Sequence, residues 1–210
     1  MTAPVIAVLD YGIGNLRSAE KALQKVGADA RLTRDPDFVA TADAVVLPGV
    51  GAFGACMDDL RAAGLEKVVH QAVDSGRPFL GICVGMQMLF TGSEENLEAR
   101  GLDIISGMVK WIPPGVKRPQ MQWNKLNFEH PKDPMFTGPL LSQSADGSWV
   151  YFVHSLHGVP NDDKVIAATC EYGGTLNAAF RLGNVFATQF HPEKSHHWGV
   201  QLLKNFAERT

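Results

Sequence analysis

The chain has 210 residues, of which 45% are hydrophobic and 20% are charged, and its formal net charge is -3 at pH 7. This composition is typical of a soluble globular protein, and the length favours a single domain over residues 1–210. No basic stripe and no apolar run of membrane-spanning length occurs, so we expect neither a nucleic-acid nor a membrane partner. Three cysteines argue against a disulfide framework and favour a reducing, cytoplasmic location.

Strand and helix patterns alternate through the first half of the chain. Short apolar runs typical of buried strands occupy residues 5–9, 30–33, 44–47 and 79–82. Helical spacing of apolar residues occurs at 16–26, 57–62 and 65–73, and again after the turn at 83, through Phe90. Such alternation predicts a mostly parallel central sheet with helices on both faces.

The second half of the chain has a different pattern. Prolines crowd residues 113–139, where helical spacing is weak, so this stretch predicts loops and short strands. Strand patterns follow at 108–112, 125–128, 150–154, 165–170, 177–181 and 185–190, with a tight hairpin at 182–185 and a final helix around 200–206. These strands predict an antiparallel extension of the same sheet rather than a second domain.

Cys83 lies at the centre of the most informative segment. Residues 79–87 join an apolar run, a Gly-x-Cys-x-Gly turn and an apolar helix start without a gap. This is the pattern of a nucleophile elbow with sulfur in place of the serine oxygen. The following helix would direct its N-terminal amides at the sulfur, which favours the thiolate form. Taken alone, the same turn is also compatible with a buried structural cysteine.

A second segment supplies the other two groups of a catalytic triad. Phe190-His191-Pro192-Glu193 follows another apolar run, and its acid stands two residues after its histidine. Alone, such a segment is often a surface turn. Because both segments end predicted strands, we interpret Cys83 as the nucleophile, His191 as the base and Glu193 as the group that orients the base.

A thiolate that attacks an acyl carbon also needs hydrogen-bond donors for the oxyanion. The amide of Val84, directly after the nucleophile, is one candidate by elbow geometry. The second candidate is Val50 in the Pro-Gly-Val-Gly loop at 48–51, because loops that end neighbouring parallel strands meet at one edge of the sheet. The Gly49–Val50 peptide can rotate readily, since one of its partners is glycine.

The other cysteine and histidine residues indicate no second site. Cys56 lies in a helical pattern and Cys170 in a strand pattern, so both are interpreted as structural, and neither is expected to slow turnover. His196 and His197 have no acid or cysteine cluster to complete a metal site, and no metal is expected. The loop at 11–14 lacks the glycine spacing and the lysine of a phosphate-binding loop.

Three separated segments resemble the class I (triad) glutamine amidotransferases: Pro-Gly-Val-Gly at 48–51, Gly-Ile-Cys-Val-Gly-Met-Gln at 81–87 and Phe-His-Pro-Glu at 190–193. Segments at 10–16, 119–124, 151–155 and 191–195 are similar to the glutaminase subunits of that family that serve histidine biosynthesis. The resemblance spans nearly the whole chain. It implies a flavodoxin-like α/β fold, glutamine hydrolysis through a Cys83 thioester, and no cofactor.

The resemblance also implies roles for residues outside the triad. The residues implied to hold glutamine, partly through their backbone, are Gly51, Gln87, Ser155 and Leu156. The implied partner is a (β/α)8-barrel cyclase that receives the ammonia through a tunnel. The residues implied to contact this partner are Trp123, Tyr151 and Lys194.

Three departures from the family pattern stand out. Gln122 replaces a glycine before the tryptophan, Leu156-His157 replaces an aromatic pair, and His196 stands where glutamine is common. None of them lies in the triad. The first two could alter the glutamine pocket or the coupling to the partner.

Three alternatives remain open on the sequence. The chain could serve pyridoxal phosphate, anthranilate or guanylate synthesis, although the segments at 11–15 and 151–155 argue against these pathways. It could be a cysteine hydrolase that acts alone on peptides or small aldehydes, which the acid after His191 disfavours. It could also be a silent scaffold, which the complete triad disfavours.

Overall fold

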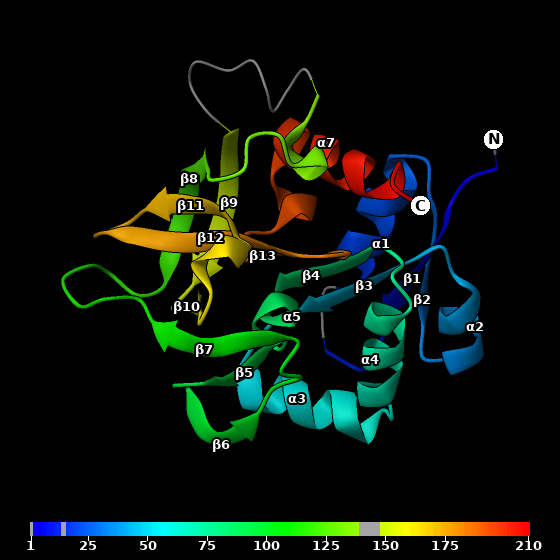
Figure 1. Ribbon diagram of the computed structural model, residues 1–210, viewed down its shortest axis with the longest axis horizontal. Coiled ribbons are helices and arrows are strands. Elements are labelled where there is room, and N and C mark those ends of the chain that lie inside the picture. The colour runs from blue at the N-terminus through cyan, green and yellow to red at the C-terminus, as the bar shows by residue number, and fades with distance from the viewer. Residues whose placement is uncertain (1, 14–15, 139–147) are drawn as a thin grey trace.

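The computed structural model describes residues 2–13, 16–138 and 148–210. A nine-stranded sheet forms its centre (Figure 1). In spatial order its strands are β2 (Asp29–Thr33), β1 (Val5–Leu9), β3 (Ala44–Gly49), β4 (Phe79–Cys83), β13 (Val185–Thr188), β12 (Thr175–Leu182), β11 (Ile166–Glu171), β8 (Gln120–Phe128) and β9 (Ser148–His154). The strands from β2 to β13 are parallel and those from β13 to β9 antiparallel, which confirms the predicted antiparallel extension of the sheet. The strand predicted at 108–112 is the exception, because it belongs to a second sheet.

Helices cover both faces of the parallel part, as the alternating pattern predicts. On one face lie α1 (Leu16–Lys25) and α7 (His196–Ala207), and on the other lie α3 (Phe53–Ala62), α4 (Glu66–Asp74) and α5 (Val84–Gln87) (Figure 1). The short helix α2 (Pro36–Thr41) packs against α4. Leu16, Ala19 and Leu23 form the buried stripe of α1, because residues three and four apart share one helix face. Gly14 and Asn15, which belong to the segment that resembles the family before α1, lie outside the described residues.

The helix predicted to run from the elbow through Phe90 is wrong beyond Gln87. The chain leaves α5 and forms β5 (Phe90–Ser93), which pairs in parallel with β7 (Ile105–Trp111). Together with β6 (Asn96–Arg100) and β10 (Leu156–Pro160) these strands form a second, four-stranded sheet that the sequence does not reveal. Short apolar runs fit helix and strand equally well, and here the long-range pairing decides between them.

An aromatic contact joins the two sheets. The ring centroids of Phe90 in β5 and Phe180 in β12 are 5.2 Å apart in an edge-to-face arrangement. Gly158 in β10 lies against both rings, and a Cβ there would come within 2.4 Å of Phe90 and 2.8 Å of Phe180. The close packing of this junction therefore requires glycine at position 158.

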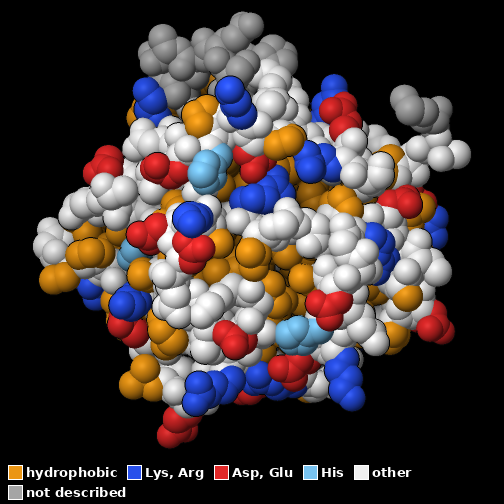
Figure 2. All heavy atoms as spheres, viewed as in Figure 1, with side chains coloured by type: hydrophobic (Ala, Val, Ile, Leu, Met, Phe, Trp, Pro, Cys, Tyr) orange, Lys and Arg blue, Asp and Glu red, His pale blue; other side chains and the backbone are white. Residues whose placement is uncertain are grey.

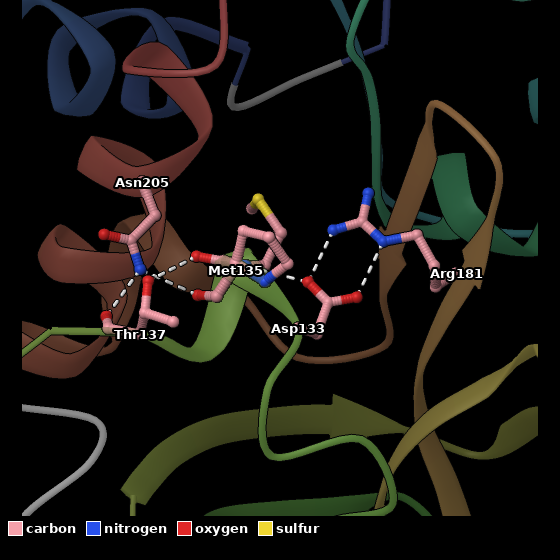
Figure 3. Close-up of polar contacts among 6 residues, drawn as sticks. Asp133, Met135, Thr137, Arg181 and Asn205 are labelled. Carbon is pink, nitrogen blue, oxygen red and sulfur yellow. Dashed lines mark hydrogen bonds and ion pairs between the residues drawn. The ribbon is translucent and has the colours of Figure 1, made fainter.

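A buried ion pair anchors a short turn that packs against α7. Asp133 caps the 3-10 turn η1 (Pro134–Phe136) by accepting from the Met135 amide at 2.8 Å, and it accepts two bonds from Arg181 at 2.7 and 2.8 Å (Figure 3). Asn205 of α7 donates to the carbonyls of Met135 and Thr137. One carboxylate therefore ties η1 to β12, and one amide ties it to α7.

Asp133→Asn is expected to lower the free energy of unfolding at pH 7 by about 2 kcal/mol, because it breaks a charge-assisted pair. Burial raises the pKa of Asp133, but Arg181 and the Met135 amide outweigh it and hold that pKa below its ordinary value. The stabilisation is therefore present above the unfolded pKa and is lost as the pH falls through the lowered folded one. Urea unfolding should show a constant difference down to about pH 5 that shrinks below about pH 4.

Asp162→Asn is the matched control for this prediction. Asp162 is exposed and caps the turn η2 (Asp163–Val165) in the same way, by accepting from the Lys164 amide at 3.0 Å. It should cost much less stability. Equal losses for the two variants would contradict a special role for the pair with Arg181.

Charged side chains of both signs are interspersed over the face of the molecule seen in Figure 2. In the part of the chain that the structure describes, no helix is long and apolar enough to cross a membrane. Among the same residues, no group of three or more histidine, cysteine and acidic side chains is arranged to hold a metal ion.

Candidate active site

Two parallel neighbouring strands bring the predicted nucleophile, Cys83, and the predicted base, His191, together. Cys83 ends β4, and His191 follows β13, which pairs with β4 in parallel so that Thr188 lies opposite Ile82. Because parallel strands end at the same edge of a sheet, the two side chains meet there although they are far apart in the sequence.

The turn at Cys83 has the sharp conformation that the elbow pattern predicts. Its φ of 54° lies in the left-handed region, where residues other than glycine are strained. Gly85 makes the turn possible, because a Cβ at that position would lie 1.9 Å from the Leu47 carbonyl oxygen. The elbow therefore packs directly against β3.

His191 and Glu193 form a buried pair beside Cys83. The Nδ1 atom of His191 lies 2.7 Å from Oε1 of Glu193, and their side chains are 3% and 5% exposed. Burial lowers the pKa of His191, but hydrogen bonds with Cys83 and Glu193 outweigh it and hold that pKa well above its ordinary value. Nδ1 is occupied by Glu193, so Nε2 is the atom available to Cys83. The site favours a protonated imidazole facing the sulfur.

Ser195 holds this pair in position. It is fully buried, its hydroxyl donates to the His191 carbonyl at 2.6 Å, and it accepts from the Tyr151 amide at 3.0 Å. The His191 amide in turn donates to the Tyr151 carbonyl at 3.1 Å. These bonds fix the turn η3 (Pro192–Lys194), and with it His191, to β9.

A cavity of about 270 Å³ opens beside Cys83. Its lining residues are Val50, Gly51, Cys83, Val84, Gln87, Glu95, Val153, His154, Ser155, Leu156 and His191. The structure thus brings both predicted oxyanion donors and all four residues implied to hold glutamine to one cavity with the nucleophile and the base. Glu193 lies behind His191, where an orienting group belongs.

Gln189 is a residue of this site that sequence reasoning missed. It is fully buried, and its Nε2 lies 3.8 Å from the sulfur of Cys83. Its Oε1 accepts from the Nε2 of Gln87 at 3.0 Å, and Gln87 also lies 3.4 Å from the Leu156 carbonyl. A polar side chain directly before Phe190-His191, inside an apolar strand pattern, was the available signal.

His154 supports the opposite wall of the cavity. Burial lowers its pKa to about 4, so its ring is neutral at pH 7. Its Nδ1 lies 2.7 Å from the Leu156 carbonyl, which can only accept, so Nδ1 carries the proton. Its Nε2 is then an acceptor 2.9 Å from the terminal amide of Gln120, whose otherwise unpaired nitrogen must face the ring to donate. Leu156 therefore contributes a fixed backbone, which explains how a leucine can replace an aromatic side chain there.

Glu95 is the second residue that the sequence did not reveal. Its carboxylate lines the cavity and accepts from the Phe53 amide, the first of α3, at 2.6 Å. In the sequence, Glu94 and Glu95 are indistinguishable from a solvated turn. Only the small sheet, whose hairpin between β5 and β6 carries Glu95 to the mouth of the cavity, indicates a role.

The residues implied to contact a partner lie close to the triad. Trp123 and Tyr151 face each other across β8 and β9, with ring centroids 6.1 Å apart, and Trp123 is 39% exposed. Lys194 is exposed on η3, one residue after Glu193. The ring of His196, one of the departures from the family pattern, lies 5.1 Å from that of Trp123. Gln122, another departure, is exposed on β8.

The fold and the site define a class of protein. Residues 7–210 match the family described as glutamine amidotransferase class-I, and the chain belongs to this family. A structure described as PurLQS from Thermotoga maritima shares the fold with a TM-score of 0.74, 19% identity and 98% coverage of both chains. Another, described as glutamine amidotransferase, has a TM-score of 0.70 at 22% identity over 94% of this chain and 98% of that chain.

Three relatives with 46–50% sequence identity share one name. The chain is 50% identical to the imidazole glycerol phosphate synthase subunit HisH of Syntrophotalea carbinolica, with 97% of this chain and 100% of the relative covered. It is 46% identical to the subunit of the same name from Geobacter sulfurreducens, with 97% and 98% covered. The subunit HisH of Acinetobacter baylyi is 49% identical, with 97% of both chains covered.

Proposed function

We propose that this chain is the glutaminase subunit of an imidazole glycerol phosphate synthase and releases ammonia from glutamine. The observation that carries the proposal is the buried arrangement of Cys83, His191 and Glu193 at the wall of a cavity large enough for one amino acid. The names of its relatives, at up to 50% identity over nearly the full length, support the same assignment.

The geometry supports a two-stage acyl transfer. The Cys83 thiolate attacks the carboxamide carbon, and the amides of Val50 and Val84 stabilise the oxyanion. As the C–N bond breaks, His191 gives its proton to the leaving nitrogen, which departs as ammonia and leaves a glutamyl thioester. A water then attacks the thioester while His191 takes its proton, and Cys83 leaves as thiolate with glutamate released.

The cavity offers complementary groups for the amino-acid end of glutamine. Glu95 is the acid on its wall outside the triad, and a carboxylate there suits the α-ammonium group. Gly51 and the backbone of Ser155 and Leu156 provide amides and carbonyls for the remaining polar atoms. Gln87, held by Gln189, closes the inner end beside Cys83.

The proposed partner is a (β/α)8-barrel cyclase that uses the ammonia. Trp123 and Lys194 are exposed and Tyr151 is half-buried, and two aromatic rings and one cation near His191 suit a contact where ammonia must pass between subunits. The word subunit in the names of the relatives supports an assembled enzyme.

The test is glutamine hydrolysis by the chain in complex with the cyclase, followed as glutamate formed, with and without the cyclase's phosphorylated ribulosyl nucleotide. Glutamate and the cyclised product should form in equal amounts. Hydrolysis of peptides or small aldehydes, with no glutaminase activity in the complex, would favour the lone cysteine hydrolase instead.

His191→Asn is expected to be nearly as damaging as loss of Cys83, whereas the loss for Glu193→Gln should be roughly a hundredfold smaller. Glutamine at 193 can still accept from Nδ1, so the ring keeps its orientation while the charge that favours the imidazolium is lost. The measurement is kcat for glutamine with partner and nucleotide present. A larger loss for Glu193→Gln than for His191→Asn would overturn the assignment of roles.

A further inference from the structure

Two buried side chains donate hydrogen bonds to the loop at 48–51, which carries the candidate oxyanion donor Val50 and is called the oxyanion loop below. The hydroxyl of Tyr11 donates to the Pro48 carbonyl at 2.6 Å, and the thiol of Cys56 donates to the Val50 carbonyl at 3.4 Å. We propose that Tyr11 and Cys56 are positioning residues that confine movement of this loop to rotation of the Gly49–Val50 peptide. The inference rests on the proposed function and adds to it two residues that do not touch substrate.

Tyr11 and Cys56, the two anchors of the loop, both act as hydrogen-bond donors to backbone carbonyls. Tyr11 is 3% exposed and Cys56 is fully buried, and a carbonyl oxygen can only accept. Burial raises the pKa of Cys56 to about 12 and also raises that of Tyr11, so both groups keep their protons at neutral pH. Each anchor is therefore a permanent donor, and each is fixed to a different carbonyl of the loop.

The anchored carbonyls flank the peptide that must turn. Pro48 O belongs to the peptide before Gly49–Val50, and Val50 O belongs to the peptide after it. Gly49 lies against the elbow, where a Cβ would come within 2.5 Å of the Gly85 nitrogen and 2.8 Å of the Tyr11 oxygen. With both neighbours held, the central peptide can rotate about its flanking bonds without displacing the rest of the loop.

The anchors matter for rate because the oxyanion donor must stand at a defined place. Without one of them the loop can relax in other ways, and the Val50 amide spends less time in the catalytic orientation. Loss of the donor altogether costs roughly 10²–10³-fold in rate, so partial misplacement should cost about five- to tenfold. The sequence alone suggests that Cys56 and Cys170 are equivalent structural cysteines, whereas in the structure Cys56 donates to the Val50 carbonyl.

The test compares Cys56→Ala, Cys56→Ser and Tyr11→Phe with the wild type, in complex with the cyclase and its nucleotide. The matched control is Cys170→Ala, which removes another fully buried thiol. One readout is kcat and KM for glutamine per folded molecule. The other is the rate at which iodoacetamide alkylates Cys83, because that displacement builds no oxyanion and reports only the nucleophile and its base.

We expect Cys56→Ala and Tyr11→Phe to lower kcat about five- to tenfold, with KM and the alkylation rate unchanged. Cys56→Ser keeps a donor and should restore most of kcat, and Cys170→Ala should match the wild type. Wild-type kcat in both Cys56→Ala and Tyr11→Phe, or equal losses of kcat and alkylation rate, would overturn the proposal. A wild-type complex that hydrolyses no glutamine would instead refute the proposed function.

Discussion

Cys83→Ser should abolish glutamine hydrolysis, with a loss on the order of 10⁴-fold or more. The serine side chain has nearly the same shape as cysteine. Its hydroxyl stays protonated, however, and is a far weaker nucleophile than a thiolate. The pKa of His191 is raised in part by Cys83, so the substitution also removes the interaction that holds His191 protonated for the leaving ammonia. The substitution therefore impairs both formation of the thioester and release of ammonia.

The measurement is glutamate formation by the complex, alongside cyclised product formed from added ammonium salt. The second reaction bypasses the glutaminase and should continue at the wild-type rate, which shows that the variant folds and binds its partner. Cys170→Ser is the control for loss of a buried thiol. If Cys83→Ser kept more than about a tenth of the glutaminase rate, Cys83 would not be the nucleophile.

The isolated chain should be a very poor glutaminase, and nucleotide bound to the partner should raise its rate roughly 10²–10³-fold. Ammonia made without an acceptor is wasted, so a two-subunit enzyme benefits from a latch. We propose that rotation of the Gly49–Val50 peptide is this latch, because the oxyanion hole would be complete only with the Val50 amide facing Cys83. The nucleotide need only favour that orientation by about 3–4 kcal/mol.

Val50→Pro deletes the donor and is expected to remove the stimulated activity, whereas Val50→Ala keeps the amide and should respond to nucleotide as the wild type does. Hydrolysis is measured for the chain alone, for the complex, and for the complex with nucleotide. A fast isolated chain that ignores partner and nucleotide would refute the latch and weaken the assignment to this synthase.

Local patterns predicted most of the parallel sheet. The run Val5–Leu9 is buried on both faces, so it reads as a strand wherever it is placed, and the structure has a strand with the same bounds. The hairpin after Leu182 was recognisable because Gly183 and Asn184 suit a two-residue turn, and Leu182 pairs with Val185 in the sheet. These features depend on neighbouring residues only.

The small sheet could not be predicted in this way. Its strand β5 pairs with β7, and the apolar run that contains it continues the helical spacing after the elbow. The backbone amides of Ile104 and Ile105 both donate to the carbonyl of Leu89. This carbonyl is therefore not available to continue the helix. Periodicity shows which side chains become buried, but it does not show which element will cover them.

The candidate site likewise combines features that local motifs predict with features that depend on long-range packing. By itself the sequence determined the elbow at Cys83 and the acid two residues after His191, because each is a short motif at a strand end. Only the tertiary structure decided that β4 and β13 lie side by side, that Gln189 lies beside the Cys83 sulfur, that Glu95 lines the cavity, and that Cys56 donates to the Val50 carbonyl. The physical reason is that a motif carries its chemistry in adjacent residues, whereas the groups that orient it come from strands and helices whose neighbours are chosen by packing of the whole core.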